Sequence, residues 1–157
     1  MSKSALPRMV RPALLALTMA LPTVGIPRQA AAQDIMSSVS DKHMESVLND
    51  MDIEFSKGKS EHSWRVKLAG YNALLIMAND NTDAQLYIAF GDKTVGAGKM
   101  NEWNKTKRFA RAYSDDDSNP ALESDLDFAG GVTDDAIKAW IKLYETSVTS
   151  FVKYLNN

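Results

Sequence analysis

The sequence has no cysteine, and this absence excludes several kinds of protein at once. Among its 157 residues there are also only two histidines, His43 and His62. A chain without thiols forms no disulfide, no thiolate metal site and no cysteine-linked lipid anchor. Neither histidine is spaced with other ligands in the way that a zinc site requires. The sequence therefore predicts no bound metal or cofactor and a fold held together by its apolar core.

The chain also lacks an apolar run long enough to cross a membrane, although its first residues have an export pattern. Three basic residues precede the short apolar segment 13–21, and Ala30–Ala32 supplies the small residues that signal peptidase recognises. A membrane span needs about 20 apolar residues, and prolines interrupt this stretch. We expect residues 1–32 to be a cleaved secretory signal and the mature protein to begin at Gln33 in the periplasm or outside the cell. An uncleaved membrane anchor is the alternative.

Positive charge becomes scarce once the expected signal is removed. Residues 1–32 hold four basic residues and no acid, so cleavage takes the formal net charge from −2 to −6. An acidic chain repels phosphate backbones, so we expect no nucleic-acid partner. The remaining residues, 33–157, are enough for one domain with an apolar core.

The apolar pattern of this domain predicts helices at both ends and strands between them. Apolar side chains recur at i, i+3, i+4 and i+7 from Ile137 to Leu155, directly after Thr133 at a capping position. Segment 64–68 alternates apolar and polar residues, which is typical of a strand with one wet face. Segment 71–78 is almost wholly apolar and predicts a central strand covered on both faces.

The order of the expected elements describes an α+β domain. The expected helices span 37–50, with Ser40 or Ser37 near the start, 98–106 and the residues after Thr133. The expected strands span 52–55, 64–68, 71–78, 86–90, 108–114 and 121–128. We expect an antiparallel sheet of about five strands, since the first segment is short. An N-terminal, a middle and a long C-terminal helix pack on it.

A set of motifs between Trp103 and Thr133 resembles the YbjN-domain family of bacterial proteins. The motifs are, in order, Trp103-Asn104, Arg108-Phe109, an acid-rich turn, Leu126-Asp127 and Gly130-Gly-Val-Thr133. The family is labelled as a regulator of sensory transduction, and its fold is similar to that of type III secretion chaperones. The resemblance implies a secretion-chaperone-like fold and a small regulatory or binding module. It implies no catalytic residues, so none is assigned here.

The acidic loop 115–120 has the composition of a calcium loop but not its spacing. An EF-hand loop needs glycine at its sixth position and a bidentate glutamate at its twelfth. Counted from Asp115, these positions hold Pro120 and Leu126. The composition also suits a polar hairpin turn, which is the structure we expect. A loose surface calcium site is the alternative.

Three acids suggest a surface for a partner. Glu123, Asp125 and Asp127 alternate along one expected strand, so their side chains share a face and suit a basic partner. The simpler interpretation is a solvated face whose charges pair with Arg108 or Arg111 on the neighbouring strand.

Trp103 is the second candidate for a partner surface. It lies on a short helix that glycines weaken, so we expect the indole to be partly exposed and to form a binding edge. We expect an exported, non-enzymatic module that binds a protein or peptide, with a homodimer as one candidate assembly. The alternatives are an envelope sensory protein that binds a small ligand or ion, and an unrecognised hydrolase. A closed pocket with converging ionisable groups favours the enzyme, a deep cavity favours the ligand, and a grooved apolar patch favours a peptide.

Overall fold

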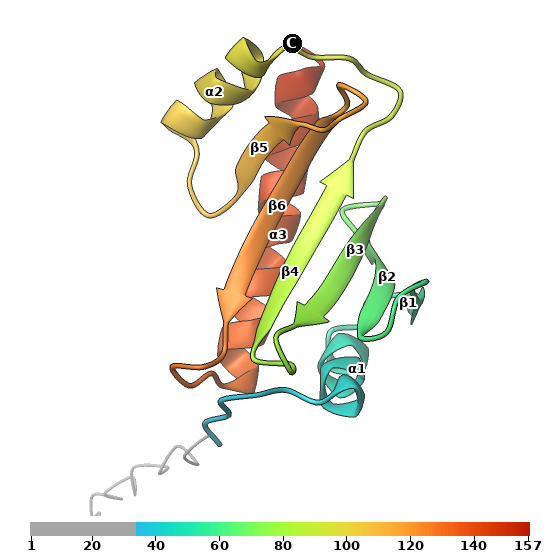
Figure 1. The fold of residues 1–157 in the computed structure, drawn as a ribbon, viewed down its shortest axis with the longest axis vertical. Coiled ribbons are helices and arrows are strands. Elements are labelled where there is room, and N and C mark those ends of the chain that lie inside the picture. The colour runs from blue at the N-terminus through green and yellow to red at the C-terminus, as the bar shows by residue number, and fades with distance from the viewer. Residues whose placement is uncertain (1–33) are drawn as a thin grey trace, which may run out of the picture. The chain divides into compact units, whose positions relative to one another are not determined.

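The computed structural model describes residues 34–157, so the expected export signal and its cleavage site lie outside the described residues. The described chain forms an antiparallel sheet with three helices (Figure 1), which confirms the predicted α+β class. The sheet has six strands where about five were expected. The helices are α1 (Asp41–Asp50), α2 (Ala97–Thr106) and α3 (Asp134–Leu155), and the strands are β1 (Phe55–Lys57), β2 (Ser63–Leu68), β3 (Tyr71–Ala78), β4 (Asp83–Ala89), β5 (Arg111–Ser114) and β6 (Pro120–Asp127). Within these residues no helix is both long and apolar enough to span a membrane.

The strands lie in the order β1-β2-β3-β4-β6-β5, with every neighbouring pair antiparallel. The first four strands follow one another along the chain. The segment that contains α2 then carries the chain past the position of β6, so β5 becomes the edge strand and β6 returns between β5 and β4. In Figure 1, α3 lies behind the sheet and α2 lies beside β5.

One face of the sheet carries the core. The register places Trp64, Leu75 and Leu86 side by side on this face, and all three are buried. α3 covers it, with the Tyr144 hydroxyl donating to the Leu122 carbonyl at 2.7 Å. The buried residues of α3 are Ile137, Trp140, Ile141, Tyr144, Ser147, Val148, Phe151 and Leu155. The predicted apolar stripe is therefore the core face of the helix, and of its predicted members only Val152 is half-buried.

The other face, which we call the open face, has no helix over it among the described residues. Its members include Arg65, Lys67, Asn72, Leu74, Ile76, Asp83, Gln85, Tyr87, Arg111, Tyr113, Glu123, Asp125 and Asp127. The prediction that β3 is covered on both faces is wrong. Leu74 and Ile76 are only half-buried, because side chains of the neighbouring strands shield them and no second layer does.

Local backbone conformation sets several boundaries that differ from the predicted ones. Ser40 caps α1 by accepting a hydrogen bond from the His43 amide at 3.2 Å, so this helix begins at Asp41 and not at residue 37. β1 begins at Phe55 instead of residue 52, because Asp52 has a φ of 55°, which a strand does not accommodate. Thr133 caps α3 as predicted, accepting from the Ala136 amide at 3.3 Å.

Candidate functional site

The candidate site lies where β5 stops short of the end of β6. β5 was expected to begin at Arg108, but Phe109 has a φ of 71° and the strand begins at Arg111. The Ser124 hydroxyl donates to the Phe109 carbonyl at 2.8 Å. Because Ser124 points to the core face, this bond places the Phe109 carbonyl on the core side of β6.

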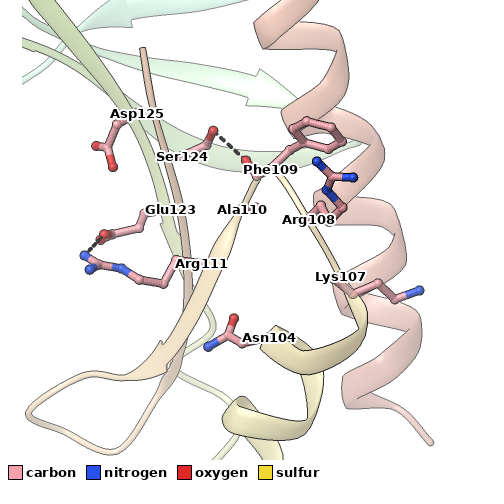
Figure 2. Close-up of a pocket in the computed structure, with 9 residues that line it drawn as sticks. All are labelled: Asn104, Lys107, Arg108, Phe109, Ala110, Arg111, Glu123, Ser124 and Asp125. Carbon is pink, nitrogen blue, oxygen red and sulfur yellow. Dashed lines mark hydrogen bonds and ion pairs between the residues drawn. The ribbon is translucent and has the colours of Figure 1, made fainter. Parts of the chain in front are cut away.

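An open depression of about 550 Å³ lies between this loop and β6 (Figure 2). Its walls are the α2–β5 loop with the start of β5 on one side and Glu123, Ser124 and Asp125 on the other. Phe109 is 62% exposed, which makes it the most exposed aromatic side chain among residues 34–157. The wall formed by the loop also carries Lys107 and Arg108, so the two walls differ in charge.

Glu123 is the one acid of the open face that is buried, at 4% exposure. Its carboxylate pairs with the guanidinium of Arg111, which is its cross-strand neighbour. The hydrogen bond to Glu123 raises the pKa of Arg111 above its usual value. The predicted ion pair with the neighbouring strand is therefore confirmed for Arg111, and the Glu123 charge is already neutralised within the protein.

Two tyrosines flank the Glu123 carboxylate on the open face. Tyr87 is its cross-strand neighbour on β4, and Tyr113 lies one pair further along β5. Burial raises the pKa of Tyr113 to about 12, and the nearby carboxylate acts in the same direction. Burial and the charges of Asp115 and Glu123 also raise the pKa of Tyr87. Both phenols therefore stay protonated at neutral pH and are not poised to act as bases.

The other two acids remain accessible. Asp125 and Asp127 are exposed on the same face as Glu123, as their spacing predicts. The Asp125 carboxylate accepts a hydrogen bond from the Gln85 amide side chain at 2.9 Å, and the Asp127 carboxylate accepts one from the Ala129 backbone at 2.8 Å. The structure thus brings the three predicted acids to one face. Within residues 34–157 neither Asp125 nor Asp127 forms an ion pair at contact distance, although the charge of Asp125 helps to raise the pKa of Arg111.

Trp103 does not lie at this surface, and the expectation that it is partly exposed is wrong. It is 1% exposed, and its ring centroid lies 4.9 Å from that of Phe151 and 5.4 Å from that of Tyr154. α2 forms despite its glycines because Met100 and Trp103 both bury against the core. The indole nitrogen has no hydrogen-bond partner within the described chain.

Asn104, next to Trp103, has a role that sequence reasoning missed. Its amide nitrogen donates to the Ala112 carbonyl at 2.8 Å, and its oxygen accepts from the Ala112 amide at 2.9 Å. The side chain thus satisfies both outward-facing backbone groups of Ala112 on β5. The motif Trp103-Asn104 singled out this residue in the sequence. Its role could not be predicted, because Asn104 bonds to β5, a strand that comes later in the chain.

The acidic loop between β5 and β6 forms a polar turn. The Asp115 carboxylate accepts from the backbone amides of Asp117 at 3.0 Å and Asn119 at 2.8 Å. The histidines are separate from this turn: His62 contacts Asp41 at 2.6 Å and His43 contacts Asp134 at 2.7 Å. Across residues 34–157 no group of three metal-ligating side chains is close enough to hold an ion.

A second depression, of about 450 Å³, lies on the open face over β2 and β3. Leu74 and Ile76 contribute an apolar floor, and Lys59 and Arg65 contribute a basic rim. The open face therefore has basic side chains over β2 and acidic side chains over β6, with apolar residues between them.

Comparison with known proteins identifies the family. Residues 40–157 match the family model YbjN, which is described as "putative bacterial sensory transduction regulator". The crystal structure of YbjN from E. coli, titled a "putative transcription regulator", is similar to this chain with a TM-score of 0.56 at 14% sequence identity. The match covers 71% of this chain and 86% of that one, and at this identity it shows a shared fold. No curated protein matches the chain. Since the family model spans the whole sheet and all three helices, the chain belongs to the YbjN family.

Proposed function

We propose that this protein is an exported, non-enzymatic regulatory module that binds an extended segment of another protein over the open face of its sheet. The observation that carries the proposal is the half-buried apolar pair Leu74 and Ile76, which lies between charged rims of opposite sign. Apolar surface rimmed by polar groups is typical of protein-binding sites. The family description as a regulator is compatible with such a module.

The chemistry of the described site favours a binder over an enzyme. Its most buried ionisable group, Glu123, is paired with Arg111, and the flanking phenols are protonated at neutral pH. Acid–base catalysis needs groups that titrate near the working pH and converge on one reacting atom. The depression beside β6 is open, whereas small-molecule sites enclose most of their ligand. The depression over β2 and β3 is more enclosed. The geometry beside β6 therefore favours a peptide over a small ligand.

A capture experiment with matched variants tests this function. The mature chain is used as bait with the envelope fraction, beside Ile76→Lys on the open face and Leu143→Lys on the outer side of α3. Both changes place a lysine where an accessible aliphatic side chain stood. The proposal predicts that Ile76→Lys loses a captured protein that the wild type and Leu143→Lys both retain. Equal capture by all three, or capture by none, would contradict it.

A further inference from the structure

We propose that the partner segment binds by adding a strand to β6 along Glu123–Asp127, and that it presents basic side chains to Asp125 and Asp127. This proposal rests on the peptide-binding function given above and adds the place, the bonding and the chemistry of the partner.

The hydrogen bonds to β4 establish which residues of β6 face that strand. The Phe90 amide donates to the Pro120 carbonyl at 3.0 Å, and the Phe128 amide donates to the Thr82 carbonyl at 2.7 Å. Hydrogen-bonded residues alternate along an antiparallel strand, so the even-numbered residues of β6 bond to β4. The odd-numbered residues direct their N–H and C=O groups to the other side.

On that other side β5 satisfies only the first part of the strand. Ala121 pairs with Tyr113, and Glu123 pairs with Arg111. Arg111 is the first residue of β5, so β5 does not extend along β6 beyond Glu123. The backbone N–H and C=O groups of Asp125 therefore face the depression, and those of Asp127 lie beyond it, with no strand beside either residue among residues 34–157. Unpaired groups of this kind are a template for another strand, and proteins usually cover them.

The neighbouring edge shows that this protein does cover its strands elsewhere. Asn104 bonds to both outward-facing groups of Ala112, so the outer edge of β5 is closed at that residue. Among residues 34–157 no side chain closes the edge of β6 at Asp125 in this way, and the bond from Ser124 to Phe109 ties the α2–β5 loop to the core side of the strand. The outer edge of β5 is therefore closed at Ala112, whereas the edge of β6 is accessible at Asp125.

Charge identifies the occupant of this edge. A strand added beside β6 places alternate side chains next to Asp125 and Asp127 on the open face, where lysine or arginine forms favourable cross-strand pairs. Its other side chains face the exposed ring of Phe109, over which the Arg108 guanidinium lies 5.1 Å from the ring centroid. Apolar residues suit these positions, because a basic side chain there would meet the charge of Arg108. A second copy of β6 would bring its own acids to the same place, and like charges oppose that pairing. The fitting partner is a segment that alternates basic and apolar residues.

Amide exchange in the presence of a defined probe tests the strand addition. The probe is a synthetic hexapeptide of alternating lysine and valine with blocked ends, and its control has glutamate in place of lysine. In ¹⁵N-labelled mature protein, the lysine peptide should slow hydrogen exchange of the Asp125 and Asp127 amides and leave the already bonded Leu126 amide unchanged. The glutamate peptide should slow neither. Unchanged exchange at Asp125 with saturating lysine peptide would overturn the proposal.

Two variants separate the backbone bond from the side-chain charge. Asp125→Pro removes an N–H that bonds to no strand in the free protein, so it should lower the affinity for the lysine peptide at least about tenfold while the fold persists. Asp125→Ala keeps the N–H and loses one charge pair, so its affinity should fall about two- to fivefold. Equal affinity of Asp125→Pro and Asp125→Ala would contradict strand addition, as would peptide shifts confined to Leu74 and Ile76. The latter result would leave peptide binding by the open face intact. If Asp125→Pro fails to fold, the exchange experiment on the unchanged protein still decides.

Discussion

Glu45 illustrates how one carboxylate can join a helix to the sheet. It lies on α1, accepts a hydrogen bond from the Trp64 indole of β2 at 2.9 Å and pairs with the Lys57 ammonium of β1 at 2.7 Å. The hydrogen bond to Lys57, followed by that to Trp64, holds the pKa of Glu45 below its usual value. A carboxylate with a lowered pKa in the folded state stabilises the fold above its unfolded pKa. That contribution is lost as the pH falls through the folded value.

The contact of Glu45 with Lys57 and Trp64 should make the fold sensitive to acid. Glu45→Gln keeps an oxygen that accepts from Trp64 but removes the charge that faces Lys57. We expect the variant to be less stable than the wild type near pH 6 and to lose less stability between pH 6 and about pH 3. Urea midpoints at the two pH values measure this, with Glu61→Gln on the exposed β1–β2 turn as the control. A wild-type acid dependence in Glu45→Gln would contradict the assignment.

The two buried indoles of the helices allow a matched comparison. Trp140 donates to the Ser124 hydroxyl at 3.0 Å, whereas the Trp103 nitrogen has no partner within the described chain. Replacing either by phenylalanine removes a similar volume, but only Trp140→Phe breaks a buried hydrogen bond. We expect Trp140→Phe to be more destabilising than Trp103→Phe by about 1 kcal/mol in urea unfolding. A larger loss for Trp103→Phe would indicate that its indole nitrogen is bonded in solution.

Single residues also show where sequence reasoning reaches its limit. The common face of Glu123, Asp125 and Asp127 followed from the period of a strand and is confirmed. The burial of Trp103 did not follow, because it depends on Phe151 and Tyr154, which lie about fifty residues further along the chain. The same holds for Asn104, whose strand partner is set by tertiary packing.

At the scale of whole elements, α3 holds the domain together. Its apolar stripe covers the core face of the sheet, and no disulfide supports it, since the chain has no cysteine. Removing a buried large aromatic side chain costs about 3–5 kcal/mol, from lost transfer energy and from the cavity left behind. A domain of this size is stable by roughly 5–15 kcal/mol in total.

The buried and the exposed side of α3 should differ in their contribution to stability. Trp140→Ala should leave the protein strongly destabilised or largely unfolded, whereas Lys142→Ala on the exposed side should change stability by less than about 0.5 kcal/mol. Urea unfolding of both variants measures the difference. Similar midpoints would mean that the contacts seen for Trp140 contribute little to folding.

The elements differ in how well their ends could be predicted. α3 followed the predicted pattern closely, because helical spacing and the cap at Thr133 are local features. β1 and β5 began later than expected, since Asp52 and Phe109 take left-handed backbone conformations that composition does not reveal. The apolar run of β3 suggested two covered faces, but an apolar open face produces the same pattern.

At the scale of the whole molecule, the described chain has two unlike sides. Three helices and the core occupy one side of the sheet or its ends, and the other side is left to solvent with a basic, an apolar and an acidic zone. The family model shows which family the chain belongs to, and that family is described as a regulator. Neither the family nor its description names a partner. The expected homodimer likewise stays a prediction.

Export is the prediction that concerns the chain outside the described residues. The basic start, the short apolar segment 13–21 and the small residues Ala30–Ala32 motivate it. We expect N-terminal sequencing of the protein recovered from the envelope or medium to begin at or near Gln33. A sequence beginning at Met1 or Ser2 would contradict cleavage.

Photo-crosslinking in the living cell tests most directly whether the open face binds another protein. A photoreactive amino acid replaces Ile76 on the open face in one strain and Leu143 on the outer side of α3 in another. We expect a discrete crosslinked product at Ile76, with a partner segment that mass spectrometry identifies, and no such product at Leu143. Crosslinks at Leu143 but not at Ile76 would contradict this expectation.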